Sequence, residues 1–199
     1  MLDEAGESHA IVSGVRGGLR YRNARIHGVW AHSGGAPRDS RADAVFAFAD
    51  LVQALDADWA EVLDGGEDLA VTFGRVDAAG PLHAMAKVPG QLEFCLDLRS
   101  EDNAVLDRMD AMLKSRIAAI EAARPGIRFE LGAQSRSQPM QLSPRLGDWL
   151  EAGAASLGAQ SPAMANQLAG RTPTGTARPQ QGRRASGPFR WPGPILPAR

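Results

Sequence analysis

The clearest pattern in the chain is an alternation of apolar and polar residues over 91–99. Successive side chains of a strand point to opposite faces of its sheet, so this alternation predicts a strand with one buried face. A second alternation over 68–77 and an interleaved segment over 19–30 predict two further strands. A short alternation over 127–131 predicts the last one. The buried face of the 91–99 strand is expected to consist of Leu92, Phe94, Leu96 and Leu98.

Two longer segments instead repeat apolar residues at steps of three and four, which is the spacing of one helix face. The first helix is expected over about 41–63, starting near Ser40, and the second over 101–123 with Ser100 as its capping residue. A shorter helix is expected over 142–157. The two predicted apolar stripes are Val45, Phe48, Val52, Leu55, Trp59 and Val62, and Leu106, Met109, Leu113, Ile117 and Ile120.

The order of these elements, β-α-β-β-α-β, predicts an α+β ferredoxin-like sandwich. Four antiparallel strands would form one sheet, with both helices on one face and a polar opposite face. The 68–77 strand is expected at an edge of this sheet. It contains Val71, Phe73 and Val76 but no Lys or Pro that would block pairing with another strand. We therefore expect a homodimer formed through this edge.

Charge divides the chain into an acidic body and a basic tail. Residues 1–151 contain 16 Lys or Arg and all 23 acidic residues, whereas residues 152–199 contain 6 Arg and no acidic residue. The tail is also rich in Pro and Gly, which disfavour both helix and sheet. We therefore expect residues 160–199 to be disordered.

Composition excludes several classes of protein. The 199 residues include 44% hydrophobic and 23% charged residues, as in an ordinary globular domain, and no apolar run is long enough to span a membrane. The acidic start MLDEAGES lacks the features of a signal peptide, so the expected location is the cytoplasm. Cys95 is the single cysteine, and we interpret it as structural. An RNA-binding module of this fold needs exposed aromatic residues on its central strands, and 91–99 offers none there, so no nucleic-acid partner is expected.

Two residues are candidates for chemistry, and each also has a simpler interpretation. His32 lies in an Ala-His-Ser-Gly-Gly loop, where it is either a polar loop residue or a hydrogen-bond donor to a developing oxyanion. Arg99 ends the 91–99 strand, where it is either an ion-pair partner of Asp97 or Glu130 or a clamp for a substrate carboxylate. The residue types alone leave these alternatives open.

A self-contained metal site is not expected from the sequence. His27 and His32 are five residues apart, which is not a same-face helical spacing, and no His-x-x-x-His or His-x-Asp pair occurs. The glycine-rich sequences that bind phosphate groups are absent as well.

Three stretches, taken together, resemble one known family. They are GVRGGLRYRNARIHGVWAHSGGAPRDSRADAV at 14–45, VTFGRV at 71–76 and KVPGQLEFCLDLRSEDN at 87–103. These stretches resemble the N-carbamoyl-L-amino acid hydrolase and allantoate amidohydrolase group of zinc-dependent amidohydrolases, which are relatives of the metallo-aminoacylases and dinuclear-zinc exopeptidases. The resemblance covers about 1–155. Its most specific part is the pattern formed by Gly28, His32, Gly34, Pro37, Arg41, Asp43 and Ala44.

The resemblance implies a place in an enzyme and roles for three positions. The matching region of that family is an inserted lid and dimerisation domain with a ferredoxin-like fold. The resemblance implies that His32 reaches the active site across a homodimer and polarises the scissile carbonyl, and that Arg99 binds the substrate carboxylate. A family asparagine thirteen positions before this arginine is replaced here by Ala86, and His83 is our candidate to substitute for it in substrate binding.

The resemblance also implies hydrolysis of a carbamoyl or amide C–N bond in N-carbamoyl amino acids or ureido acids, with zinc or manganese as cofactor. The metal ligands and catalytic glutamate of the family lie in a catalytic domain on both sides of the lid, and their motifs do not occur in this sequence. We therefore expect a fragment that binds no metal and is inactive alone. The alternative hypothesis is a stand-alone, dimerising ferredoxin-like interaction module without catalysis.

This interpretation divides the chain into four parts. Residues 19–135 would be the lid and dimerisation domain, and 1–18 and 136–159 would be its two joins to the catalytic domain. The chain has 20 Arg but only 2 Lys, which indicates GC-rich coding DNA. Out-of-frame translation of such DNA yields Arg, Pro, Gly and Ala but few acidic residues, which is the composition of the tail. We therefore interpret 160–199 as a tail translated out of frame, after a frameshift near 160–166.

Overall fold

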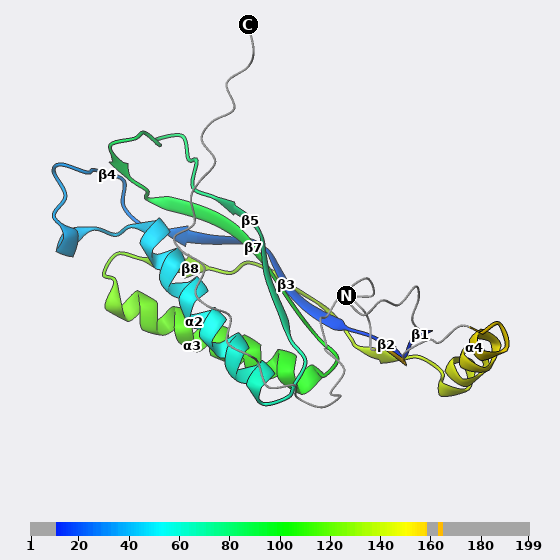
Figure 1. Ribbon diagram of the computed structural model, residues 1–199. Helices are drawn as coiled ribbons and strands as arrows, with labels where there is room; N and C mark the ends of the chain where they lie inside the picture. The colour runs from blue at the N-terminus through cyan, green and yellow to red at the C-terminus, as the bar shows by residue number, and fades with distance from the viewer. Residues whose placement is uncertain (1–10, 159–162, 165–199) are drawn as a thin grey trace, which may run out of the picture.

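The computed structural model describes residues 11–158 and 163–164 (Figure 1). The MLDEAGES segment and, apart from 163–164, the tail for which disorder was predicted lie outside the described residues. The described elements are β1 (Ile11–Val12), β2 (Gly14–Val15), β3 (Gly17–His27), β4 (Ala31–His32), the 3-10 helix η1 (Arg38–Ser40), α2 (Ala44–Asp64), β5 (Ala70–Asp77), β6 (Lys87–Val88), β7 (Gln91–Ser100), α3 (Asn103–Ala123), β8 (Arg128–Glu130), β9 (Gln134–Ser137), β10 (Met140–Gln141), α4 (Pro144–Ser156) and β11 (Ala163–Met164).

The main sheet is antiparallel, with the strand order β5-β7-β3-β8 and with β9 paired to β3 as well. β8 pairs with the end of β3 and β9 with its first half, so the two short strands share one side of β3. The predicted α+β fold with an antiparallel sheet is confirmed, and β9 is one strand more than the four predicted. Within the described part of the chain β5 pairs with β7 alone, which confirms that it is an edge strand.

The core lies between this sheet and the two long helices, α2 and α3, which cover one of its faces (Figure 1). The predicted alternation of β7 is confirmed, because all four of its apolar side chains are at most 1% exposed. The ring of Phe94 packs against those of Phe48 and Phe73, at centroid distances of 5.4 and 5.9 Å. The predicted stripe of α3 is also confirmed, with Leu106, Met109, Leu113, Ile117 and Ile120 all buried.

The buried stripe of α2 is rotated relative to the prediction. Val45 is 39% exposed, whereas the small residues Ala44 and Ala47 are fully buried. Leu51 is buried in place of Val52, which was predicted to be buried. The prediction favoured the larger apolar residues, but close packing of a helix on a sheet also needs small ones, and these set the face that α2 buries.

The helix caps differ from the predictions as well. Asp43 caps α2, with its carboxylate accepting hydrogen bonds from the backbone N–H groups of residues 45 and 46. Asp102 caps α3. Ser40 belongs to η1, and the Ser100 hydroxyl donates to the carbonyl of Asp68 instead. The observed caps are aspartates three and two residues further along the chain, and each has the extended backbone conformation typical of an N-cap.

A hydrogen-bonded network fastens α3 to the sheet. The Tyr21 hydroxyl donates to Asp110 at 2.7 Å and accepts from the side-chain amide of Gln134, while Lys114 donates to the other carboxylate oxygen of Asp110 at 2.8 Å. Burial raises the pKa of Tyr21, and its hydrogen bond to Asp110 raises it further. Burial alone would also raise the pKa of Asp110, but the hydrogen bonds from Lys114 and Tyr21 outweigh it and hold that pKa below its ordinary value.

We expect Asp110→Asn to lower the free energy of unfolding at pH 7 by about 1 kcal/mol, because it removes the charge from this network. The pKa of Asp110 is lower in the folded than in the unfolded chain, so its contribution is present above the unfolded-state pKa and is lost as the pH falls through the folded-state value. The difference between the variant and the wild type should therefore shrink below about pH 4. Urea unfolding at pH 7 and at pH 3 measures it, and a difference that grew on acidification would contradict the assignment.

A narrower part of the molecule extends from the end of the sheet where β3 begins. β2 pairs with β10, β1 pairs with β11, and α4 contacts β1. Figure 1 shows this part at the opposite end of the molecule from β4. The helix predicted over 142–157 is confirmed as α4. None of the helices in the described ranges is both long and apolar enough to cross a membrane.

Candidate functional site

His32 lies at the tip of the molecule, in the two-stranded ladder formed by β4 and β6. Its Cα pairs with that of Lys87. The backbone N–H of Gly34 donates to His32 Nδ1 at 3.2 Å, which makes Nδ1 the acceptor and Nε2 the protonated nitrogen. The ring is exposed. His32 can therefore present an Nε2–H donor to a bound molecule, and the hydrogen bond at Nδ1 sets its tautomer.

Close backbone contacts anchor the loop that carries His32. The N–H of Gly28 donates to the carbonyl of Gly90, and the N–H of Val29 donates to the carbonyl of Ala42, both at 2.9 Å. At the far side of the loop, Arg41 Nε donates to the carbonyl of Ala36 at 2.8 Å. Hydrogen bonds to backbone carbonyls thus hold the loop together and fasten it to the residues just before α2 and β7.

Position 86 lies directly beside this loop, since the N–H of Ser33 donates to the carbonyl of Ala86 at 2.8 Å. The methyl side chain of Ala86 offers no hydrogen-bonding group. His83 lies three residues earlier in the same connection, where its own N–H donates to the carbonyl of Gly80. The structure thus places His83 on the segment that borders the His32 loop.

A pocket of about 310 Å³ opens beside the ladder. One wall is the indole of Trp30, which is closely covered by two glycines: a Cβ built on Gly80 would lie 2.7 Å from the indole, and one on Gly90 would lie 2.6 Å from it. The other lining residues are small or apolar except for two that carry nitrogen groups. The residues that line the pocket are Trp30, Ala78, Ala79, His83, Ala84, Lys87 and Pro89.

Arg99 lies on the open face of the sheet and pairs with Asp97. Its Nε donates to Asp97 Oδ2 at 2.7 Å, and the second carboxylate oxygen of Asp97 lies 3.0 Å from Arg20 Nε. Of the two ion-pair partners considered for Arg99, Asp97 is therefore the one observed. Glu130 instead pairs with His27 at 3.0 Å, and that hydrogen bond lowers the pKa of Glu130. Asp97 holds Arg99 through Nε, and among the described residues no partner is seen for the two terminal nitrogens of the guanidinium, which could bind a carboxylate.

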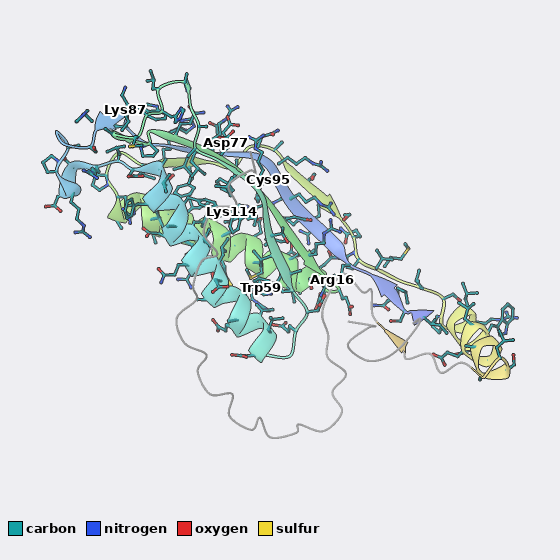
Figure 2. The ribbon with its side chains drawn as sticks, turned by 45° about the horizontal axis from the view of Figure 1, so that its top comes forward. Arg16, Trp59, Asp77, Lys87, Cys95 and Lys114 are labelled. Carbon is teal, nitrogen blue, oxygen red and sulfur yellow. The ribbon has the colours of Figure 1, made fainter. Side chains whose placement is uncertain are left out.

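His32 and Arg99 of one chain lie far apart. Arg99 is eight residues from Gln91, where β7 starts, and a strand advances by about 3.3 Å per residue, which separates these two positions by about 26 Å. The partner of His32, Lys87, precedes that start. Arg16 marks the Arg99 end of the sheet, because the next residue, Gly17, pairs with Ser100. Figure 2 shows Lys87 at one end of the sheet and Arg16 at the other. One small molecule cannot contact both residues of the same chain.

The described residues do not fit a metal centre. Within 11–158 and 163–164, no group of three or more His, Cys, Asp and Glu side chains could hold a metal ion. The zinc or manganese site that the sequence resemblance implies thus has no ligand set in this part of the chain.

Two residues of the pocket, Trp30 and Lys87, were not among the residues predicted from the sequence. A signal for Lys87 was present, because it is one of only two lysines among 22 basic residues and lies in a stretch that carries the family resemblance. Trp30 also lies in a stretch that carries the resemblance, but nothing in the sequence indicated that Gly80 and Gly90 pack against its indole.

Comparison with curated proteins finds partial relatives, whereas no family model matches the chain. The chain is 29% identical over 142 residues to the allantoate amidohydrolase of Escherichia coli K12, covering 70% of this chain and 33% of that protein. It is 26% identical over 145 residues to the N-carbamoyl-L-amino-acid amidohydrolase of Rhizobium meliloti, covering 71% and 32%. The chain thus spans about a third of the length of these relatives.

A solved structure agrees with these matches. A hydantoinase/carbamoylase family amidase from Burkholderia ambifaria superimposes on the chain with a TM-score of 0.70 and 26% sequence identity. The match covers 83% of this chain and 39% of the amidase. Both the sequence matches and the structural match therefore cover only part of these longer relatives.

Proposed function

We propose that this chain, which is homologous to the allantoate amidohydrolase and N-carbamoyl-L-amino-acid amidohydrolase family over about a third of the length of those proteins, forms the lid and dimerisation part of an amidohydrolase. That family is metal-dependent and acts on C–N bonds other than peptide bonds. The substrates would be N-carbamoyl amino acids or ureido acids, cleaved at a carbamoyl or amide C–N bond. The metal ligands would belong to a catalytic part that the described residues do not include.

The observation that carries this proposal is the extent of the structural match. It covers 83% of this chain, and therefore most of the described residues, but only 39% of the Burkholderia amidase. A domain that matches less than half of an enzyme is expected to bind the rest of that enzyme and to assist its catalysis. The apolar residues on the narrow end of the molecule support this view, because exposed patches of such residues mark interaction sites. These residues are Val12, Val15, Met140, Leu142, Leu146, Trp149, Leu150 and Leu157.

The separation of His32 from Arg99 supports a site shared between two subunits. If both residues act on one substrate, they must come from different chains, because Arg99 lies about 26 Å along β7 from Gln91 and the partner of His32, Lys87, precedes that strand. In a two-fold dimer each subunit would then contribute Arg99 to one site and His32 to the other. Arg99 would hold the substrate carboxylate through its terminal nitrogens, and His32 would donate from Nε2 to the oxyanion that develops on the attacked carbonyl.

The edge strand β5 is the surface we propose for dimerisation. Its backbone groups on the side away from β7 have no strand partner in the described part of the chain. Such an edge is a template for pairing with another strand unless charge or proline blocks it. β5 contains no proline, and its single basic residue, Arg75, is occupied by an ion pair with Glu93. Two copies could thus join their sheets edge to edge.

We expect the purified 199-residue chain to hydrolyse neither allantoate nor N-carbamoyl-L-amino acids, even with added zinc or manganese, because its described residues contain no ligand cluster. Release of ammonia and of free amino acid measures the rate, with the allantoate amidohydrolase of Escherichia coli as the positive control. Metal-dependent turnover that is abolished by His32→Ala would contradict this expectation, because a contaminating enzyme would not respond to that substitution.

The alternative is a dimerising interaction module without a catalytic partner, and the free edge of β5 is the observation that favours it. The two proposals differ at the narrow end of the molecule. A lid should bind a catalytic part through Trp149 and Leu150, whereas a stand-alone module has no use for an apolar surface there. Binding to a family amidohydrolase from which the matched third has been deleted distinguishes them. Trp149→Ser should abolish this binding if the chain is a lid.

A further inference from the structure

The pocket beside the β4–β6 ladder combines an apolar interior with basic groups. Trp30 and three alanines supply the apolar walls, while Lys87 and His83 supply the nitrogen groups. Both residues are exposed and line the pocket. At about 310 Å³ the pocket is at the lower end of the range for small-molecule sites, which begins at about 300 Å³. It has room for a short side chain rather than for a large ligand.

The strand register places this pocket next to His32. His32 and Lys87 are directly opposite each other in the antiparallel ladder. Residues that are directly opposite in such a pair have their side chains on the same face, with Cβ atoms about 5 Å apart. A molecule whose anionic end is held by Lys87 therefore has its remaining atoms within reach of the His32 ring.

The charge of Lys87 is not used elsewhere in the described structure. Arg20, Arg25, Arg75 and Arg99 on the open face of the sheet each lie against Asp97 or Glu93. The other lysine of the chain, Lys114, pairs with Asp110. Within 11–158, Lys87 forms no such ion pair. A cation at the opening of an apolar pocket is suited to bind the carboxylate of a short aliphatic chain.

We infer that this pocket binds a side-chain carboxylate of the substrate, with Lys87 as its cationic partner and His83 beside it. The inference rests on the proposed function and narrows it. Arg99 of one subunit would hold the α-carboxylate, and Lys87 of the other would hold a second carboxylate two or three carbons away. The substrate class is then a carbamoyl or ureido derivative of an acidic amino acid, whose methylene groups pack against Trp30.

Two ligands that differ in one group test this subsite on the intact 199-residue chain. N-carbamoyl-L-glutamate and N-carbamoyl-L-glutamine share every group except the side-chain carboxylate, which is an amide in the second. Reductive methylation with ¹³C-formaldehyde labels the two lysines and the amino terminus, so each lysine gives its own NMR signal. N-carbamoyl-L-glutamate should shift the Lys87 signal and leave the Lys114 signal in place. The glutamate derivative should bind about fivefold more tightly than the glutamine derivative.

Three variants complete the test. Lys87→Met should remove the preference between the two ligands, and Lys87→Arg should retain most of it because the charge remains. Lys114→Met is the matched control, which assigns the signals and should leave the preference unchanged. Equal binding of the two ligands, or a preference that survives Lys87→Met, would overturn the inference. A Lys87 signal that shifts with protein concentration but not with ligand would also overturn it, because Lys87 then faces another copy of the chain.

This binding experiment is independent of the proposed enzyme function. It requires neither a catalytic part nor turnover, so an inactive chain can still show the preference. Conversely, the chain could restore activity to a catalytic part and yet show no preference for the acidic derivative. That result would support the proposed function and refute only the subsite.

Discussion

Thr72→Pro is expected to convert the proposed dimer into monomers. Thr72 lies in the middle of the edge strand β5, opposite Asp97 of β7, and is exposed. Proline removes a backbone N–H and places a ring on the strand, both of which oppose the pairing of two edges. Sedimentation velocity of the chain at tens of micromolar measures the effect. The wild type should sediment as a dimer, and the variant should sediment as a folded monomer.

The control for this prediction is Thr72→Lys, which keeps the N–H and adds a positive charge on the polar face of the sheet. If the backbone of β5 forms the interface, this variant should remain folded and retain more dimer than the proline variant. Circular dichroism and the thermal transition of each variant show whether the domain is still folded. A wild type that is monomeric at these concentrations would refute the dimer and, with it, the proposed contribution of His32 to a neighbouring site.

Gly28→Ala is expected to destabilise the fold by about 3 kcal/mol or more, because the added methyl group has no room. A Cβ on Gly28 would lie 2.2 Å from the carbonyl oxygen of Ala42 and 3.2 Å from the side chain of Ile127. The carbonyl cannot easily move away, since it accepts the hydrogen bond of Val29 that anchors the His32 loop. Denaturant unfolding measures the loss.

Gly35→Ala is the matched control for Gly28→Ala. Gly35 lies in the same loop, but a Cβ there would meet only the carbonyl oxygen of His32 at 3.8 Å, an ordinary contact. We expect this variant to change the free energy of unfolding by less than about 1 kcal/mol. If both variants unfolded at the same denaturant concentration, the close packing around Gly28 would not be what anchors the loop.

Regular hydrophobic patterns that continue over a whole strand or helix made much of the fold predictable. The alternation of β7 and the apolar stripe of α3 are regular because every turn or pleat presents one residue to the same core, and both predictions are confirmed. The face of α2 was not predictable in the same way, because the close approach of helix and sheet selects Ala44 and Ala47 over Val45. The strand β9 is polar and short, Gln-Ser-Arg-Ser, so no hydrophobic pattern marked it.

The candidate site was predictable only in part, for a related reason. His32 and Arg99 could be named from the sequence, but whether they meet depends on the length of β7 between them. The pocket depends on contacts between Trp30, Gly80 and Gly90, which are far apart along the chain. Arg99 had two possible ion-pair partners, and only the geometry of the strand selects Asp97, two residues away on the same face.

The central claim is that this domain completes an amidohydrolase site shared by two subunits, and a chimera tests it. Residues 11–158 would replace the matched third of the allantoate amidohydrolase of Escherichia coli. The chimera should form a dimer that hydrolyses carbamoyl or ureido substrates, with either His32→Ala or Arg99→Ala reducing the rate by about 100-fold or more. Each single variant should still dimerise, as its parent does.

Co-expression of these two inactive variants is the decisive measurement. In random dimers half of the molecules are mixed, and each mixed dimer has one site with both an intact His32 and an intact Arg99. If the site is shared, about a quarter of the parent chimera's activity should return. If both residues act within one chain, the co-expressed mixture should stay as inactive as its two components. If neither residue acts at the site, the single variants should lose no activity. Either result would contradict the account.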